Sequence, residues 1–118
     1  MRFLIASTLL VSALVLASPA TAGPKKVTGK IISFDCGDNC YLTIKPAKGD
    51  EINALCSIGA CVPWFEKQQM PAKFVGKLIE VTVGIGKQFD GSGNDMGEYP
   101  EFTTAVLVKA PVKKKTTY

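Results

Sequence analysis

Four cysteines are the side chains with the clearest chemistry in this chain of 118 residues. They come as two close pairs, Cys36-x3-Cys40 and Cys56-x4-Cys61. An even number of cysteines in a small exported chain is typical of structural disulfides. Closeness in sequence favours Cys36–Cys40 with Cys56–Cys61. The pairing of Cys40 with Cys56 and of Cys36 with Cys61 remains open.

The same four sulfurs offer an alternative, a zinc site with the thiolates of Cys36, Cys40, Cys56 and Cys61 as ligands. Structural zinc takes four ligands in tetrahedral geometry. The spacings lack the usual Cys-x2-Cys pair, and an oxidising compartment favours disulfides over thiolates. We therefore expect disulfides and keep a four-cysteine metal-binding protein as the alternative function.

A second candidate ion site lies in a polar stretch near the C-terminal end of the chain. Asp90, Ser92 and Asn94 have the spacing of the first, third and fifth ligands of an EF-hand loop, and Glu101 falls at the twelfth position. The sixth position is Asp95 instead of glycine, and we expect no flanking helices. We predict a flexible polar connection between two strands, with calcium binding as the alternative, and no cofactor.

The N-terminus has the pattern of a secretory signal peptide. Arg2 precedes an apolar run from Phe3 to Ala17, and Ala20-Thr21-Ala22 gives the small-x-small pattern of a cleavage site. The run is shorter than the roughly 20 residues of a membrane span, which makes an uncleaved anchor the weaker alternative. We expect cleavage after Ala22, a periplasmic or secreted location, and no membrane span in the mature protein.

The mature composition argues against triad hydrolases, histidine-ligated metal enzymes and sequence-specific DNA-binding proteins. The chain has no histidine, and removal of the leader removes its single arginine, which leaves 13 lysines against 10 acidic residues, a net charge of +3. Histidine is the usual acid–base group near neutral pH, and arginine is the preferred reader of phosphate and guanine. We find no complete catalytic constellation. The composition predicts a protein that is not an enzyme and does not bind specific DNA sequences.

Alternating apolar residues predict a mostly β domain over residues 23–110, followed by a flexible lysine-rich tail at 111–118. Gly29 suggests a bulge or a sharp bend in the first strand, as at a barrel corner, and Pro63 suits the first turn of the helix. In the fourth strand, alternation directs Ile79, Val81, Val83 and Ile85 inward. The expected strands are Val27–Phe34, Tyr41–Lys45, Glu51–Cys56, Lys77–Lys87 and Phe102–Lys109, with a helix in Pro63–Lys73 and a loop over Asp90–Pro100.

Two hairpins fix the register of the first three strands. Centred on Asp38 and Lys48, they place the same residues of the second strand on one apolar face. A shift of one residue would break this agreement. The register brings three of the cysteines to one end of the sheet, with Cys61 just beyond. The expected pairs are Phe34–Leu42, Ile32–Ile44, Cys36–Cys40, Ile44–Ile52, Leu42–Ala54 and Cys40–Cys56.

This order of elements, with the segments VTGKIISFDCGDNCYLTI, PWF, GKLIEVTV and EFTTAVLV, resembles small periplasmic bacterial OB-fold proteins over nearly all of the mature length. The resemblance implies a five-stranded Greek-key barrel with one short helix between the third and fourth strands. A sandwich or another small barrel is the alternative architecture. Such proteins are generally binding or accessory modules, and the resemblance identifies no catalytic residue.

The resemblance places a ligand face on the first three strands and on the loop at 88–101 that rims it. Expected partners are a protein, a glycan or a small ligand of the cell envelope. Lysines 25, 26, 30 and 113–115 indicate solvated charge, and we do not expect nucleic acid. Trp64 is predicted to plug one end of the core. The candidate ligand-binding residues are Tyr41, Thr43, Asp90, Ser92, Asn94, Asp95 and Glu98.

Overall fold

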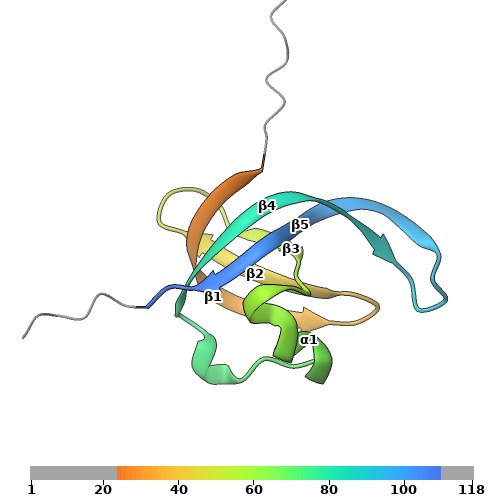
Figure 1. Ribbon diagram of the computed structural model, residues 1–118, viewed down its shortest axis with the longest axis horizontal. Helices are drawn as coiled ribbons and strands as arrows, with labels where there is room; N and C mark the ends of the chain where they lie inside the picture. Colours follow the sequence, from red (N-terminus) through yellow and green to blue (C-terminus); the bar gives the residue numbers. More distant parts are fainter. Residues whose placement is uncertain (1–23, 110–118) are drawn as a thin grey trace, which may run out of the picture.

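A computed structural model describes residues 24–109 of the chain, and within them five strands form a closed barrel (Figure 1). Neighbours follow the order β1-β2-β3-β5-β4, in which only the contact of β3 with β5 is parallel. This confirms the prediction of an all-β fold with five strands. The predicted leader (1–22) and tail (111–118) lie outside the described residues. The strands are β1 (Lys25–Cys36), β2 (Cys40–Pro46), β3 (Ile52–Leu55), β4 (Leu78–Phe89) and β5 (Asp95–Leu107).

The helical segments lie between β3 and β4, as predicted. A 3-10 turn, η1 (Gly59–Cys61), leads into α1 (Val62–Lys67), and a second 3-10 turn is η2 (Ala72–Phe74). The α-helix α1 is shorter than the predicted Pro63–Lys73. It ends at Lys67 because Gln68 adopts the left-handed conformation, with φ of 56°. Within residues 24–109, no helix is long and apolar enough to cross a membrane.

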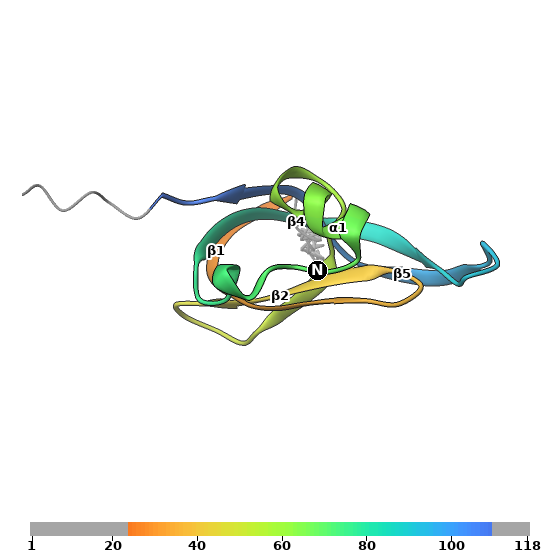
Figure 2. The same ribbon diagram turned by 90° about the horizontal axis from the view of Figure 1, so that it is seen from below.

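Trp64 of α1 closes one end of the barrel, which confirms its predicted role. Its side chain is 3% exposed and lies 5.8 Å from the ring of Phe34 and 4.9 Å from the ring of Phe74, measured between ring centroids. Figure 2 shows α1 packed against the barrel. Burial of such a large ring gives this short helix a stability that its length alone does not provide. The fully buried core also contains Ile31, Leu42, Ile44, Ile79, Val81 and Phe102.

The register of the first two hairpins is largely confirmed. Phe34 lies opposite Leu42, Leu42 opposite Ala54, and Ile44 opposite Ile52. Alternation with period two is sufficient here because each strand has one face in the core.

One part of the predicted register is wrong. Ile31, and not Ile32, pairs with Ile44, because the register between β1 and β2 shifts between Ile31 and Ser33. Ile32 is the extra residue and is 39% exposed, whereas Ile31 is fully buried. Of the two features suggested for Gly29, a bulge or a sharp bend, the bulge is therefore at Ile32 instead. Gly29 pairs regularly, and an added Cβ would lie 3.0 Å from the carbonyl carbon of Lys45, so its role is close backbone packing.

The hairpin of β4 and β5 extends beyond the barrel as a two-stranded arm, which we define as residues 84–100 (Figure 1). β1 pairs with β4 only as far as Val83, while β4 and β5 remain paired as far as Phe89 and Asp95. The prediction of a loop over Asp90–Pro100 is therefore wrong for its second half. The inward direction predicted for Ile85 is wrong as well, since this side chain is 67% exposed on the arm.

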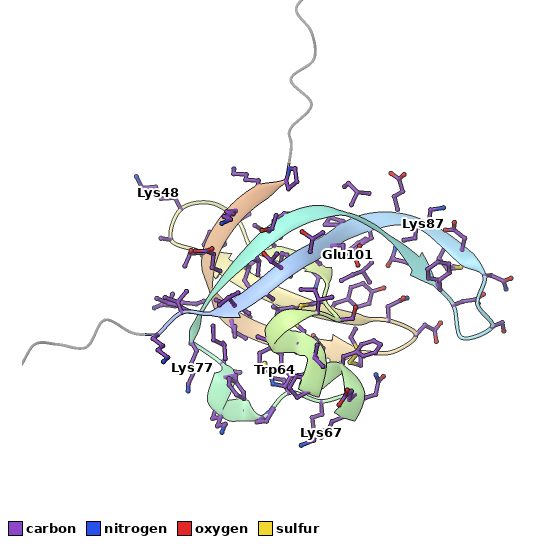
Figure 3. The ribbon with its side chains drawn as sticks, in the orientation of Figure 1. Lys48, Trp64, Lys67, Lys77, Lys87 and Glu101 are labelled. Atoms are coloured by element: carbon purple, nitrogen blue, oxygen red, sulfur yellow. A yellow bond between two sulfur atoms is a disulfide. The ribbon has the colours of Figure 1, made fainter. Side chains whose placement is uncertain are left out.

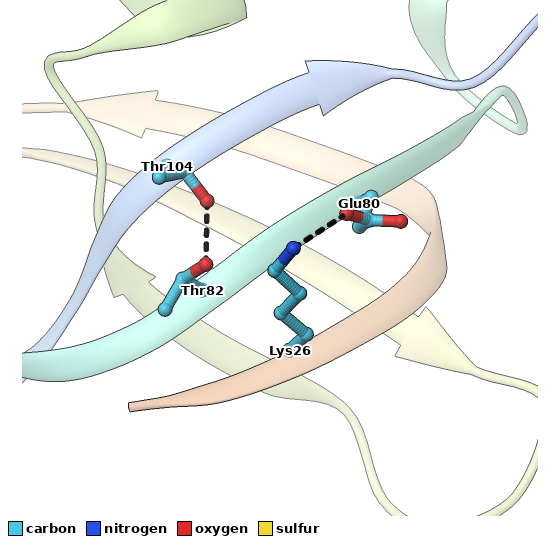
Figure 4. Close-up of polar contacts among 4 residues, drawn as sticks. All are labelled: Lys26, Glu80, Thr82 and Thr104. Carbon is cyan, nitrogen blue, oxygen red and sulfur yellow. Dashed lines mark hydrogen bonds and ion pairs between the residues drawn. The ribbon is translucent and has the colours of Figure 1, made fainter. Parts of the chain in front are cut away.

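On the outside of the barrel, polar pairs connect the three strands β1, β4 and β5 (Figure 4). The hydroxyls of Thr82 and Thr104 are 2.6 Å apart, and the Lys26 ammonium is 3.9 Å from a carboxylate oxygen of Glu80. The ion pair is exposed and contributes little to stability. The pattern agrees with a barrel whose outward positions are polar.

Candidate ligand-binding cleft

The four cysteines form two disulfides, Cys36–Cys40 and Cys56–Cys61. This is the pairing that closeness in sequence favoured. The alternative zinc site is contradicted because every one of the four sulfurs is bonded to another sulfur and none is available as a thiolate. Among the described residues, no group of three or more histidine, cysteine, aspartate or glutamate side chains is placed to hold a metal ion.

Both disulfides lie at the same end of the barrel, as the hairpin register predicted. The first closes the base of the turn between β1 and β2, and the second ties the end of β3 to η1 and thus to α1. The backbone N–H of Cys56 donates to the carbonyl of Cys40 at 3.1 Å, so the two disulfides are adjacent. This end of the molecule is therefore held together by covalent bonds.

Tyr41 and Thr43 point outward from β2, as predicted, but their polar groups are already engaged. The Tyr41 hydroxyl donates to Oε1 of Gln88 at 2.6 Å, and the Thr43 hydroxyl accepts from Nδ2 of Asn53 at 2.8 Å. The Tyr99 hydroxyl donates to Oδ1 of Asn53 at 2.6 Å. The network joins β2 and β3 to both strands of the arm.

The ring of Tyr41 also packs edge-to-face against the ring of Tyr99, with 5.4 Å between their centroids. Such aromatic pairs add roughly 0.5–1.5 kcal/mol to the burial of their surface. The structure thus gives Tyr41 and Thr43 a contact with the arm of their own chain. The ring of Tyr41, a candidate ligand-binding residue, is therefore partly covered by Tyr99.

A tight turn at residues 90–94 joins the two strands of the arm. One Asp90 carboxylate oxygen accepts from the backbone N–H groups of Ser92 and Asn94 at 2.9 and 2.8 Å, and the other accepts from the Asn94 side chain at 2.9 Å. These bonds, first that from the Asn94 side chain, hold the pKa of Asp90 below its ordinary value. The carboxylate therefore caps the turn.

The calcium spacing noted in the sequence does not correspond to a loop in three dimensions. Glu101 pairs with Gly84 at the base of the arm, whereas Asp90 lies at the tip beyond Phe89. Six residues of extended strand between Gly84 and Asp90 span about 20 Å. A single ion cannot bind both carboxylates across that distance.

The remaining predicted residues of the arm are exposed. Asp95 accepts from the N–H of Gly97 at 2.8 Å and lies 3.3 Å from the ammonium of Lys87. The Gly97 bond first, and Lys87 next, lower the pKa of Asp95. Glu98 lies opposite Lys87 in the β-ladder, and Ser92 is exposed in the turn.

Asn39 fastens the tip of the arm to the turn between β1 and β2. Its Nδ2 donates to the carbonyl of Phe89 at 2.7 Å, and its Oδ1 accepts from the N–H of Phe89 at 3.2 Å. The Asn39 amide thus binds both the N–H and the carbonyl of Phe89, the two backbone groups that a neighbouring strand would otherwise pair with. No local sequence pattern indicates this contact, because the two residues are fifty positions apart.

A cleft of about 360 Å³ opens beneath this contact. Its walls come from the turn after β1, the end of β3, α1 and the arm. Phe65 and Phe89 line it and remain 42% and 45% exposed. In Figure 3, Lys87 lies on the arm, and Glu101 lies where the arm leaves the barrel. The lining residues are Asp38, Asn39, Cys40, Leu55, Cys56, Ser57, Phe65, Lys87, Phe89 and Glu101.

Negative charge gathers around the cleft. The end of β1 with the turn that follows it, and the arm with its base, carry six acidic residues and one lysine, and that lysine is already paired with Asp95. Lys67 lies at the C-terminal end of α1 and does not line the cleft, and Lys48 and Lys77 lie on other parts of the molecule (Figure 3). The cleft therefore offers apolar rings beside unpaired carboxylates, a combination suited to a cationic ligand with an apolar part. The six acids are Asp35, Asp38, Asp90, Asp95, Glu98 and Glu101.

Comparison of the chain with protein-family models, with curated proteins and with solved structures finds no match in any of the three.

Proposed function

We propose that the protein is an exported, non-catalytic binding or accessory module of the bacterial periplasm, built on an OB-fold. The strand order β1-β2-β3-β5-β4, closed into a barrel with α1 between β3 and β4, supports this fold. Two disulfides agree with an oxidising compartment, as does the N-terminal sequence pattern. Binding would take place in the cleft between the arm and α1.

The observation that carries the proposal is the pair of exposed phenylalanines in this cleft. Phe65 comes from the helix and Phe89 from the tip of the arm, and each leaves more than two fifths of its surface in water. Phenylalanine rings that share a concave surface favour a partner that removes them from water. Asp38 and Glu101 line the same cleft and favour a basic group. The best-fitting partner is a protein segment that presents a basic side chain next to an apolar one.

The walls of the cleft are held before any partner arrives. Both disulfides, the Asn39–Phe89 contact and the Tyr41–Tyr99 pair fix the turn, the helix and the arm relative to one another. A preorganised surface loses less conformational entropy on binding. The smaller loss of conformational entropy allows a small module to bind a short segment.

The test is selection of a random peptide library, displayed on phage, against the immobilised protein. Phe65→Ser/Phe89→Ser and Asp38→Asn/Glu101→Gln are the two test variants, and Val106→Ser, at an exposed apolar position outside the cleft, is the control. We expect enriched peptides that combine lysine or arginine with an apolar residue. Synthetic peptides should bind each test variant at least tenfold more weakly and the control equally well.

Failure to enrich any sequence, or equal binding to wild type and both test variants, would remove the cleft as the binding site. Enrichment of acidic peptides would retain the cleft but contradict the charge argument. Selection of a glycan or a small ligand on a matching array, with the same dependence on the two phenylalanines, would replace the peptide as partner.

A further inference from the structure

The end of the barrel opposite Trp64 is not covered by any helix of the described residues. Three residues mark the plugged end: Phe34 near the end of β1 contacts Trp64, Cys56 directly after β3 is bonded to Cys61 of η1, and Ala105 near the end of β5 lies against Gly59 of η1. Toward the other end, the same strands present Val27, Ile52 and Pro100, which line a hollow of about 600 Å³. We call this hollow the barrel mouth. Its full lining is Pro24, Lys25, Val27, Ile52, Val83, Gly84, Ile85 and Pro100.

The barrel mouth is apolar. Five of its side chains are valine, isoleucine or proline of the strands, and none of its lining residues carries a hydroxyl, an amide or a carboxylate in its side chain. Ile85 is 67% exposed, which is more than any other large apolar side chain of the described residues. It is exposed because β4 continues past the last residue that pairs with β1. A concave apolar surface of this size falls within the range of small-molecule sites, which are often found in the mouths of β-barrels.

A single cationic group stands at the rim. Among the residues that the structure describes, Lys25 is the only charged one that lines the barrel mouth. Among residues 24–109, the ion pairs are Lys26–Glu80 and Lys87–Asp95, and neither involves Lys25. The adjoining hollow is lined by Lys25, Lys26 and Lys48, together with Asp50 and Glu51. Lys26 is paired with Glu80, and Lys48, Asp50 and Glu51 do not line the barrel mouth, so the ammonium of Lys25 is the charge that borders the apolar surface directly.

From this arrangement we propose that the barrel mouth binds a single-chain amphiphile with an anionic head, of the fatty-acid type. The hydrocarbon chain lies against Val27, Val83 and Ile85, and the carboxylate lies at the ammonium of Lys25. Burial of hydrocarbon provides the affinity, since it removes both the chain and the valine and isoleucine side chains from water. The lysine selects the sign of the head group.

This site is separate from the cleft under the arm. The two share no lining residue, because the cleft takes Lys87 and Phe89 from the arm, whereas the barrel mouth takes Gly84 and Ile85. The proposal of an amphiphile site is therefore independent of the proposed peptide partner, and each can fail without the other. A protein with both sites would bind a hydrophobic molecule and a basic segment at once.

The test is titration of the exported protein with sodium dodecanoate below its critical micelle concentration. Binding is followed by calorimetry and by the methyl NMR signals of valine and isoleucine. We expect saturable binding of one molecule per chain, with shifts at Val27, Ile52, Val83 and Ile85 and none at Ile31, which is fully buried elsewhere in the core. Absence of saturable binding, or shifts confined to other methyl groups, would overturn the proposal.

Two variants and two other probes identify the chemistry. Ile85→Ser should weaken dodecanoate binding roughly tenfold, since one isoleucine contact is lost. Val106→Ser, which is 61% exposed elsewhere on β5, should leave binding unchanged. Dodecyltrimethylammonium should bind less tightly than dodecanoate to the wild type, and Lys25→Gln should abolish that difference. Equal affinity for both head groups in the wild type would overturn the anionic preference. Binding to phosphatidylglycerol vesicles in place of free dodecanoate would overturn the single-chain ligand.

Discussion

Asn39 and Phe89 are joined by two hydrogen bonds, of 2.7 and 3.2 Å, between the side-chain amide of one and the backbone of the other. The first residue belongs to the turn after β1 and the second to the tip of the arm. An arm of two strands alone is marginally stable in water, so the anchoring at its tip determines whether it stays over the cleft. The geometry of the cleft depends on this contact.

Replacement of Asn39 by alanine should release the tip of the arm. Each of the two hydrogen bonds contributes about 0.5–1.5 kcal/mol, and their exposure places the expected loss of stability near 1 kcal/mol. Amide hydrogen exchange at residues 85–89 should accelerate by about fivefold, whereas exchange in β2 should not change. NMR-detected hydrogen exchange provides the measurement.

Gln69→Ala is the matched control for the Asn39 experiment. Gln69 is an exposed amide residue, and the structure shows a hydrogen bond only from its backbone, to the carbonyl of Trp64. Removal of the Gln69 side-chain amide should leave hydrogen exchange in the arm unchanged. If Asn39→Ala also left exchange at 85–89 unchanged, the contacts of Gln88 and Tyr99 with β2 and β3 would be sufficient to hold the arm.

The hydroxyl of Tyr99 should be coupled energetically to the amide of Asn53. The two atoms lie 2.6 Å apart in a partly buried position, where a satisfied hydrogen bond contributes about 1 kcal/mol. In a double-mutant cycle of Tyr99→Phe and Asn53→Ala, the coupling should be near that value. Chemical denaturation measures it. The pair Tyr99→Phe with Thr104→Ala, whose side chains share no hydrogen bond in the structure, should give zero coupling.

The sequence was informative wherever a strand has one face in the core. The pairs Phe34–Leu42 and Leu42–Ala54 follow from alternation, and so does the gathering of the cysteines at one end. The exchange of Ile31 for Ile32 could not be predicted, because a bulge moves the pattern by one residue and both candidates are isoleucine. Only the packing against Ile44 distinguishes them.

Neither the arm nor the cleft could be predicted from the sequence pattern. Residues 95–100 are rich in polar residues and glycine, a composition typical of loops, yet they pair with β4. They do so because β4 offers a continuous ladder and Asp90 fixes the turn. Tyr99 and Asn39 act through contacts distant in sequence, so no local signal identified them. Ile85 was predicted to point inward because the alternation of β4 continues past the end of the core, where the side chain is exposed.

Gly59 should tolerate no side chain. It has φ of +54°, and an added Cβ would collide with the carbonyl oxygen of Ala105 on β5. Gly59→Ala should therefore destabilise the protein by at least about 2 kcal/mol, because the clash adds to the strain of the left-handed backbone. Thermal unfolding measures the loss. Gly93 also has a positive φ, of +83°, but open space surrounds it. Gly93→Ala should therefore lower the stability by only about 1 kcal/mol. Equal effects of the two substitutions would mean that η1 is displaced from β5.

The two disulfides should differ in their resistance to reduction. Cys56 and Cys61 are 1% and 0% exposed, whereas Cys36 is half-buried at the base of an exposed turn. A thiolate reductant must reach a sulfur, so the Cys36–Cys40 bond should open first. Graded dithiothreitol, followed by alkylation and peptide mass spectrometry, reports the order. Simultaneous loss of both bonds would indicate that reduction requires global unfolding.

Cys36→Ala/Cys40→Ala should be tolerated better than Cys56→Ala/Cys61→Ala. Both bonds close short loops, for which disulfides contribute roughly 2–3 kcal/mol. The second pair is also buried beside Trp64 in the core, so its removal leaves a cavity as well. Chemical denaturation of the two double variants should place the second at least about 1 kcal/mol below the first. The reverse order would mean that the turn after β1 contributes more to stability than the attachment of α1.

The turn at the tip of the arm should weaken in acid. The side chain of Asn94 and the backbone N–H groups of Ser92, Gly93 and Asn94 hold the pKa of Asp90 below its ordinary value. A group with a lowered pKa in the folded state stabilises that state above its unfolded pKa, near pH 4, and this contribution is lost as pH falls through the folded pKa. The carboxyl carbon of Asp90 should titrate below the ordinary aspartate range in NMR, and hydrogen exchange of the Asn94 amide, corrected for intrinsic rates, should accelerate below about pH 4. Asp90→Asn keeps an oxygen that accepts the same backbone bonds but does not titrate, so its turn should show no such acceleration. A carboxyl titration at or above the ordinary aspartate value would show that the bonds to Asn94 are not formed in solution.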